Sequence, residues 1–275
     1  MNHRLYVPEQ HGKGAPLLVA LHGCRQDAED FAHGTRFDAF AQRYGAIVLY
    51  PEQDERRNGH RCWNWFLPEN QRRDGPEPRA ILELVERTIR EHDADRSRVF
   101  VAGLSAGACV ATILAEQAPD VFSGVGAMAG VALHCAHDVE TAYAAMRGER
   151  EANDVELERH FLGAFRRSRA MFWTGTDDRR VAPRNSRRLA EQFARLFALD
   201  STPDEEGFLA DGRCVRWHDR AGRARIELRE IPGAGHAWSG GSLRGSYTAP
   251  AAPSFSDAFF TFFLSEETEE MQRCG

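Results

Sequence analysis

Short, continuously apolar segments constrain the fold of this chain more than any other feature of its sequence. The run Leu17–Leu21 is followed by Gly23, and a second run, Ala46–Tyr50, ends at Pro51. Apolar runs of this length, without polar alternation, are typical of strands buried on both faces of a parallel sheet. The same pattern predicts further strands at Val99–Val101, Gly124–Ala129 and Met171–Trp173, and a last strand is expected at Arg225–Ile231.

Segments with helical periodicity alternate with these strands. Between residues 76 and 92 the apolar positions Ile81, Leu84, Val85 and Ile89 recur at helical spacing, with Pro76 at the start, where proline is tolerated. Further helices are predicted near residues 37–44, 106–117, 183–199 and 255–264. Alternating strands and helices indicate an α/β protein with a doubly wound, mostly parallel sheet.

The chain is expected to form a single domain over residues 1–275. It contains no repeat with a period of 20–50 residues and no linker, and 275 residues can bury a substantial core. Residues 131–168 are polar and helical in pattern, so a small helical insertion over the sheet is expected there. We expect an acidic loop at 200–212 and a frayed, acidic tail at 265–275.

Composition excludes several classes of function. The net charge of −6 argues against a nucleic-acid partner, because phosphate contacts need a basic face. No apolar run reaches the roughly 18–20 residues of a membrane span. The six cysteines include no CxxC pair, which argues against a structural zinc site. No secretory leader is recognisable, so a cytoplasmic protein is expected, unless a leader has been removed from an extracellular one.

The segment Gly103-Leu104-Ser105-Ala106-Gly107 carries the strongest chemical signal. It has the form G-x-S-x-G and lies between a predicted strand and a predicted helix, as a nucleophile elbow requires. The flanking glycines permit a sharp turn that pushes the serine hydroxyl clear of the sheet. We therefore predict that Ser105 is a catalytic nucleophile.

A serine nucleophile needs a histidine base that is oriented by an acid, and in such folds the order along the chain is serine, acid, histidine. Asp177 and Asp178 both follow the strand predicted to end at Trp173, and either carboxylate fits the acid's place. His236 lies in a glycine-rich loop after the last predicted strand and is the candidate base.

A third loop supplies the candidate oxyanion hole. The segment Leu21-His22-Gly23-Cys24 lies at the end of the strand predicted at Leu17–Leu21. In enzymes with a G-x-S-x-G nucleophile elbow, the loop after this strand provides a backbone N–H that binds the oxyanion. The second donor is the N–H of the residue after the nucleophile. The predicted donors are therefore the amides of Cys24 and Ala106.

Five ordered motifs together resemble the polyhydroxybutyrate depolymerase-type esterases, which include feruloyl and acetylxylan esterase relatives. The motifs are Leu21-His22-Gly23-Cys24, Tyr50-Pro51-Glu52-Gln53, Cys62-Trp63-Asn64-Trp65-Phe66, Gly103-Leu104-Ser105-Ala106-Gly107 and Gly235-His236-Ala237-Trp238-Ser239-Gly240-Gly241. The resemblance extends from about residue 5 to residue 264 and implies the α/β-hydrolase fold. It also implies Ser105 as nucleophile, Asp178 as acid and His236 as base, a Cys24–Cys62 disulfide, and no cofactor or metal.

The resemblance implies a serine esterase acting on small or oligomeric short-chain carboxylic esters, such as oligomers of 3-hydroxybutyrate. Alternatives are a feruloyl or acetylxylan esterase, a hydrolase of polyaspartate-like polyamides, or a binding protein that keeps the fold without turnover. Trp63, Trp65 and Trp238 lie in predicted loops and are candidates for an apolar substrate groove, with core packing as the alternative. A metal site at His134, Cys135 and His137 is disfavoured, because the implied chemistry needs none.

Overall fold

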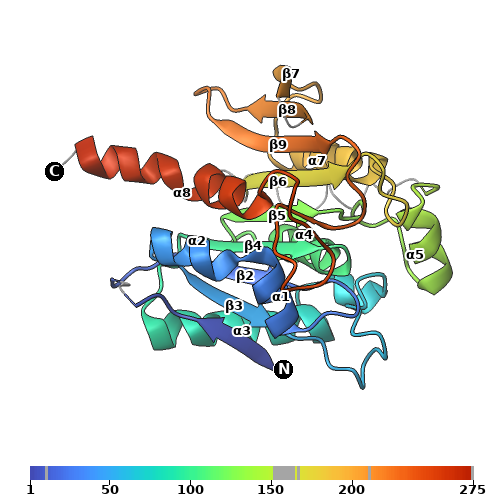
Figure 1. Cartoon of the computed structure of the whole chain (residues 1–275), viewed down its shortest axis with the longest axis horizontal. Helices are drawn as coiled ribbons and strands as arrows, with labels where there is room; N and C mark the ends of the chain where they lie inside the picture. Colours follow the sequence, from blue (N-terminus) through green and yellow to red (C-terminus); the bar gives the residue numbers. More distant parts are fainter. Residues whose placement is uncertain (10–11, 151–164, 166–167, 210–211, 274–275) are drawn as a thin grey trace.

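A computed structural model of the chain describes residues 1–9, 12–150, 165, 168–209 and 212–273 (Figure 1). Nine strands of these residues form a sheet in the order β1-β3-β2-β4-β5-β6-β9-β8-β7. The strands are β1 (His3–Tyr6), β2 (Leu17–Leu21), β3 (Ile47–Pro51), β4 (Val99–Leu104), β5 (Gly124–Met128), β6 (Arg169–Gly175), β7 (Glu205–Leu209), β8 (Gly212–His218) and β9 (Ala224–Ile231). The central strands from β3 to β9 pair in parallel, whereas β1, β7 and β8 pair antiparallel at the two edges.

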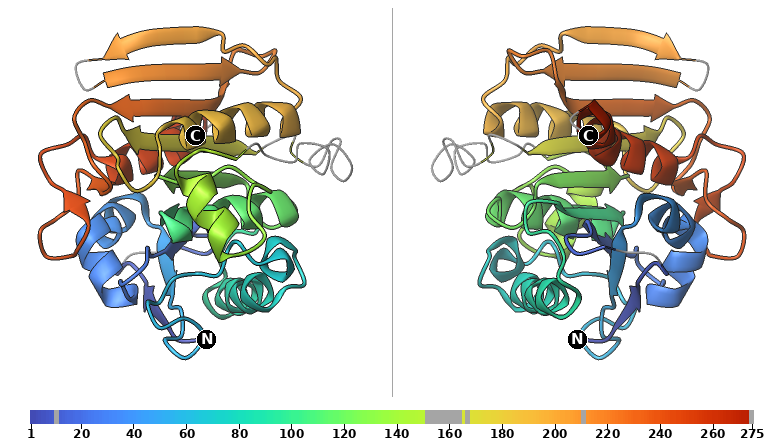
Figure 2. Two further views of the ribbon diagram at one scale, coloured as in Figure 1. Left: turned by 90° about the vertical axis from the view of Figure 1, so that its right-hand side faces the viewer. Right: turned by 90° about the vertical axis from the view of Figure 1, so that its left-hand side faces the viewer.

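Helices cover both faces of this sheet, as the two views of Figure 2 show. One face carries α1 (Ala28–Thr35), α2 (Phe37–Tyr44) and α8 (Phe255–Arg273), and the other carries α3 (Pro76–His92), α4 (Ala106–Gln117) and α7 (Arg184–Leu196). The short elements are η1 (Pro68–Gln71), α5 (Val139–Met146), β10 (Trp238–Ser239) and β11 (Thr248–Ala249). Among the described helices, none is both long enough and apolar enough to cross a membrane.

Two hydrophobic cores, one on each side of the sheet, explain why the central strands β2 to β5 are continuously apolar. In β2 the side chains of Leu17, Val19 and Leu21 enter the core shared with α3, α4 and α7. Leu18 and Ala20, which point the opposite way, enter the core shared with α1, α2 and α8. Side chains alternate between the two faces of a strand, so a strand covered by helices on both faces favours apolar residues at successive positions.

The predicted doubly wound, mostly parallel α/β sheet is confirmed. The helices predicted at residues 37–44, 76–92 and 106–117 have those same bounds in the structure. The predicted strands are present, and most of them extend one to three residues beyond the apolar runs that indicated them.

The expected acidic loop at 200–212 is wrong, because β7 lies within it and pairs antiparallel with β8. β7 is an edge strand whose side chains are mostly exposed. An exposed strand does not need apolar residues, so the sequence shows no apolar run there. The expected end of the last helix at Leu264 is also wrong. α8 continues to Arg273 through a stretch rich in glutamate, a good helix former.

The expected insertion at 131–168 is described only in part. α5 lies within it, while residues 151–164 and 166–167 fall outside the described residues. α5 begins with a capping box, in which the Asp138 carboxylate accepts from the Thr141 amide and the Thr141 hydroxyl accepts from the Asp138 amide. In Figure 2 it lies over the edge of the sheet where the parallel strands end.

We expect Phe259→Ala to destabilise the fold strongly. The Phe259 ring is 1% exposed and packs against the rings of Phe37, Phe100 and Phe263. Its loss should leave a cavity and lower the free energy of unfolding by about 3–5 kcal/mol, measured by denaturant titration. Thr261→Ala, at an exposed position of the same helix, is the matched control and should change it by no more than about 0.5 kcal/mol. Equal effects of the two changes would contradict this account of the core.

Candidate active site

Ser105 occupies a strained turn between β4 and α4. Its backbone has φ 55° and ψ −117°, a region that costs a residue with a side chain about 1–3 kcal/mol. Hydrogen bonds on either side hold the turn: the Ser105 amide donates to the Met128 carbonyl oxygen at 2.9 Å, and the Cys109 amide donates to the Ser105 carbonyl oxygen at 3.0 Å. The turn therefore presents the serine at the carboxyl edge of the sheet, at the start of a helix.

The two glycines of the G-x-S-x-G segment are required by close backbone contacts. A Cβ atom on Gly107 would lie 2.1 Å from the Leu21 carbonyl oxygen, and one on Gly103 would lie 2.4 Å from the Gly107 backbone. No side chain fits at either position without movement of the backbone. Because neither glycine has a side chain, α4 can begin directly against the end of β2, which brings Ser105 close to the loop after Leu21.

Asp178 and His236 form a buried acid–base pair. Asp178 Oδ2 lies 2.7 Å from His236 Nδ1, and the Asp178 side chain is fully buried. The other carboxylate oxygen accepts hydrogen bonds from the amides of Arg180 at 2.8 Å and Val181 at 2.9 Å. An ionised carboxylate only accepts, so Nδ1 carries the proton and Nε2 is left as the basic nitrogen of the imidazole.

The structure brings Asp178, and not Asp177, to the histidine. Asp177 is exposed, and its amide donates to the Ala234 carbonyl oxygen at 3.0 Å. A Cβ atom on Gly175 would lie 2.2 Å from that same oxygen, so the loop after β6 and the loop that carries His236 are in close backbone contact. Asp177 thus helps to join the two loops while its neighbour bonds the imidazole.

Ser105 and His236 line one cavity of about 380 Å³. Ser105 follows β4, Asp178 follows β6 and His236 follows β9, and these strands are linked through parallel pairs. The carboxyl ends of parallel strands meet at one edge of a sheet, which is where ligands bind in α/β folds. Segments more than a hundred residues apart in the sequence therefore converge there.

The two predicted oxyanion donors lie beside this cavity. Cys24 lines it, and Ala106 is the first residue of the helix that begins after Ser105. Within the described part of the chain, neither amide donates a hydrogen bond to a backbone or side-chain acceptor. The first amides of a helix lack intrahelical partners and are suited to a negatively charged oxygen.

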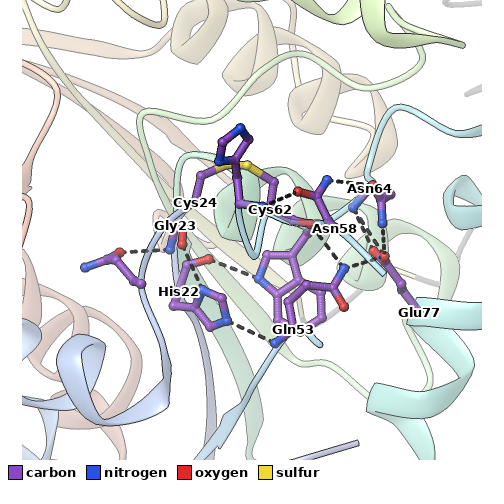
Figure 3. Close-up of a disulfide and its surroundings, with 11 residues drawn as sticks. His22, Gly23, Cys24, Gln53, Asn58, Cys62, Asn64 and Glu77 are labelled. Carbon is purple, nitrogen blue, oxygen red and sulfur yellow. Dashed lines mark hydrogen bonds between the residues drawn. A yellow bond between two sulfur atoms is a disulfide. The ribbon is translucent and has the colours of Figure 1, made fainter. Parts of the chain in front are cut away.

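A disulfide joins Cys24 to Cys62, the pair that the sequence resemblance implied (Figure 3). It links the loop after β2 to the tryptophan-rich loop after β3. Around it, the Trp63 indole N–H donates to the His22 carbonyl oxygen at 3.0 Å, and the Gln53 side-chain amide donates to the Cys62 carbonyl oxygen at 3.1 Å. These bonds hold the backbone next to each of the two half-cystines.

The carboxylate of Glu77, on α3, is the centre of the same network. It accepts hydrogen bonds from the side-chain amide of Gln53 at 2.6 Å and from the backbone and side-chain amides of Asn64. Burial raises the pKa of this carboxyl group, while the amide donors oppose the rise. Hydrogen bonds from three amide groups to one buried carboxylate tie two parts of the loop after β3 to the helix α3.

His22 is a buried histidine that hydrogen-bonds the backbone of two loops. Its Nδ1 lies 2.8 Å from the Gly23 carbonyl oxygen, and its Nε2 accepts from the Gln53 amide at 3.1 Å. Burial lowers the pKa of His22 to about 4, so the imidazole is neutral at neutral pH. Only the neutral ring accepts at Nε2, and the hydrogen-bond network therefore requires this form.

The three tryptophans proposed for a groove separate into two groups. Trp63 and Trp65 line the cavity, although both are largely buried. The proposed groove role of Trp238 is wrong: the side chain is 1% exposed, does not line the cavity, and packs against Phe37 and Phe255 in the core of α1, α2 and α8. Its indole N–H is satisfied inside that core by the Ser256 hydroxyl at 3.1 Å.

α5 contributes a wall of the cavity that the sequence analysis missed. Val139, Ala142, Tyr143 and Met146 line it, and the side chains of Val139 and Tyr143 are more than half exposed. These residues are spaced i, i+3, i+4 and i+7, the signature of one apolar helix face. That spacing is the signal in the sequence that indicates a cavity wall, within a segment expected only to form a helical insertion over the sheet.

The three residues considered for a metal site, His134, Cys135 and His137, each contact a different partner. His134 Nε2 lies 2.7 Å from Glu116 Oε1 in the interior, and the Cys135 thiol donates to the Ala132 carbonyl oxygen. His137 is exposed and lies near Asp138. In the part of the chain that the structure describes, no group of three or more His, Cys, Asp or Glu side chains is placed to hold a metal ion.

The sequence is similar to those of known esterases. The family model described as "Esterase PHB depolymerase" matches residues 1–207. The poly(3-hydroxyalkanoate) depolymerase C of Paucimonas lemoignei is 32% identical over 236 residues, which cover 84% of this chain and 57% of that protein. The feruloyl esterase B of Thermothelomyces thermophilus is 28% identical over 219 residues, covering 76% of this chain and 74% of that protein.

Solved structures share the fold. The acetyl xylan esterase from Aspergillus awamori superposes with a TM-score of 0.79 at 20% identity, over 95% of this chain and 93% of that one. An S-formylglutathione hydrolase from Agrobacterium tumefaciens gives a TM-score of 0.55 at 18% identity, over 86% and 82% of the two chains. The fold is therefore that of the α/β-hydrolase esterases.

Loss of the Cys24–Cys62 disulfide should destabilise the protein. The bond closes a loop with a sequence separation of 38 residues, and the double change Cys24→Ala/Cys62→Ala should lower the free energy of unfolding by about 2–4 kcal/mol. Denaturant titration measures this effect. Dithiothreitol should destabilise the wild type similarly and leave the double variant unchanged. An equal response of both proteins to the reductant would show that the disulfide is not its target.

Acidification should weaken the fold through His22. The folded pKa of about 4 is below the ordinary 6.5, so the unfolded chain binds the proton more readily. The stabilisation from neutral His22 is complete above about pH 6.5 and is lost as the pH falls through about 4, a contribution of about 3 kcal/mol. Unfolding free energies measured between pH 7 and pH 4 should fall less steeply in His22→Gln than in the wild type. Parallel pH profiles would refute the assignment.

Proposed function

Because this chain belongs to the esterase PHB depolymerase family of carboxylic ester hydrolases, we propose that it hydrolyses short-chain carboxylic esters through an acyl-enzyme on Ser105. The observation that carries the proposal is the 2.7 Å contact between Asp178 and His236 in a site where the imidazole and Ser105 line one cavity. A serine alcohol is a weak nucleophile at neutral pH and needs such an oriented base.

In the proposed reaction, Ser105 Oγ attacks the ester carbonyl carbon while its proton passes to His236 Nε2. Asp178 stabilises the imidazolium and keeps Nδ1 protonated. The amides of Cys24 and Ala106 donate to the oxyanion of the tetrahedral intermediate, which then expels the alcohol with the proton from Nε2. Water attacks the acyl-enzyme in the same way, the acid leaves, and the proton returns to Ser105. No cofactor takes part in this sequence.

The substrate is an ester with a small or chain-like acyl group. The cavity of about 380 Å³ has apolar walls from Trp65, Phe66 and the α5 residues, which suits a short aliphatic chain. Oligomers of 3-hydroxybutyrate are the favoured candidates, because the depolymerase relative is 32% identical. Feruloyl and acetylxylan esters are the second candidates, supported by relatives with those names.

We place the whole catalytic unit in one domain, since both cores share a single sheet. The Cys24–Cys62 disulfide supports an oxidising, extracellular compartment over the cytoplasm, where glutathione keeps most thiols reduced.

Replacement of the proposed triad residues should abolish turnover without unfolding the protein. We expect Ser105→Ala to lower kcat for a p-nitrophenyl short-chain ester by about 10⁴- to 10⁶-fold, and Asp178→Asn by about 10⁴-fold. A fluorophosphonate probe should label Ser105 in the wild type, as measured by mass spectrometry of the digested protein.

Asp177→Asn is the matched control, because it makes the same chemical change one residue away on an exposed side chain. It should keep kcat within about threefold of the wild type, since surface changes rarely disturb a buried pair. If no short-chain ester is cleaved and no adduct forms at Ser105, the proposed function is wrong. If Asp177→Asn and Asp178→Asn are equally impaired, the acid has been misidentified.

A further inference from the structure

The charge of the cavity differs from that of the whole chain. The protein carries a net charge of −6, yet no aspartate or glutamate is among the described residues that line the cavity. Two arginines, Arg25 and Arg180, do line it, together with Ser105 and His236. The wall of the site is therefore positive in a protein that is otherwise acidic.

Both arginine side chains are exposed and are not neutralised. Among the described residues, neither guanidinium has a carboxylate within 4.0 Å. The nearest acids along the adjoining loop have other partners: Asp27 pairs with Arg61 at 3.1 Å, and Asp30 accepts from the Gln26 side chain at 2.9 Å. An arginine without a carboxylate partner keeps its hydrogen-bond donors available to a ligand.

Hydrogen bonds connect the segments that carry the two arginines. The side-chain amide of Gln26, next to Arg25, donates to the Ser246 carbonyl oxygen at 3.1 Å. Tyr247, which follows, also lines the cavity, and the Arg180 guanidinium lies 5.8 Å from its ring centroid. These contacts, from Gln26 through Ser246 and Tyr247 to Arg180, link the chain segments that carry the two arginines.

Backbone bonds limit the freedom of each arginine. The Arg25 amide donates to the His60 carbonyl oxygen at 2.7 Å, beside the disulfide-linked loop. The Arg180 amide donates to the Asp178 carboxylate, so its side chain starts from a position fixed by the triad acid. Both arginine side chains therefore extend from backbone that hydrogen bonds hold in place, and they line the same cavity as Ser105 and His236.

We infer that the preferred substrates are esters that carry a free carboxylate, an inference that rests on the proposed function. Arg25 and Arg180 bind this carboxylate, while the apolar walls of the cavity hold the rest of the substrate. Guanidinium groups recognise carboxylates through paired N–H donors. A hydroxyacid oligomer with a free terminal carboxylate has this chemistry. The carboxylate belongs either to the acyl part or to the alcohol part of the ester.

Matched pairs of esters test this inference. For the acyl part, kcat/KM for the mono-p-nitrophenyl ester of glutaric acid is compared with that for its methyl-capped diester. For the alcohol part, 3-acetoxybutyrate is compared with its methyl ester. We expect the wild type to prefer the anionic member of at least one pair by about tenfold, and the pair that shows the preference identifies the carboxylate's position. The preference should decline at about 0.5 M salt, where charge interactions are screened.

The variants Arg25→Gln and Arg180→Gln should each lower kcat/KM for the preferred anionic ester by about three- to tenfold, and leave the neutral ester within about twofold. The neutral ester reports any indirect damage to the triad, since the Arg180 amide bonds Asp178. Arg179→Gln is the matched control, because Arg179 is an exposed neighbour that does not line the cavity. It should change neither value.

Three results would overturn the inference. Equal kcat/KM for the anionic and neutral members of both pairs would contradict it while leaving the esterase assignment intact. A loss of activity in the arginine variants that is the same for both charge types would mean that these residues support the site and do not read the carboxylate. Failure to cleave any ester, with no labelling of Ser105, would refute the proposed function and this inference together.

Discussion

The parallel alignment of β2, β4, β6 and β9 is the constraint on which the site depends. Each of these strands ends at the same edge of the sheet, and each is followed directly by a loop that carries one component of the site. Parallel strands with helical connections are buried on both faces, which accounts for the uninterrupted apolar runs of β2 and β4. The same residues that form the core thus determine where the polar loops meet.

Contacts between backbones then bring these loops closer than side chains would allow. Gly107 lets α4 begin against the end of β2, and Gly175 lets the acid loop touch the loop that carries the histidine. The strain at Ser105 is tolerated because bonds from both sides hold the turn. Glycine at these two positions therefore allows close contact between loops, in addition to the backbone flexibility usually attributed to this residue.

The sequence was sufficient to predict the parts governed by strong local patterns. The central strands, three helices with their bounds and the strand–serine–helix turn all follow from apolar periodicity and glycine positions. The choice between Asp177 and Asp178 did not follow from the residues alone, because adjacent residues in a turn point in different directions. Edge strand β7 and the core position of Trp238 depend on tertiary pairing and packing, which leave no periodic signal in a short segment. The cavity wall from α5 was missed although its spacing was present.

The segment that carries His236 is anchored at both ends. On one side β9 ends at Ile231 within the sheet, and on the other Trp238 is buried, with its amide bonded to the Tyr247 carbonyl oxygen at 2.7 Å. The backbone of this segment is therefore held on both sides of His236, and the bond to Asp178 at 2.7 Å orients the ring. The imidazole therefore loses most of its conformational entropy when the chain folds. Little further ordering is needed in each catalytic cycle.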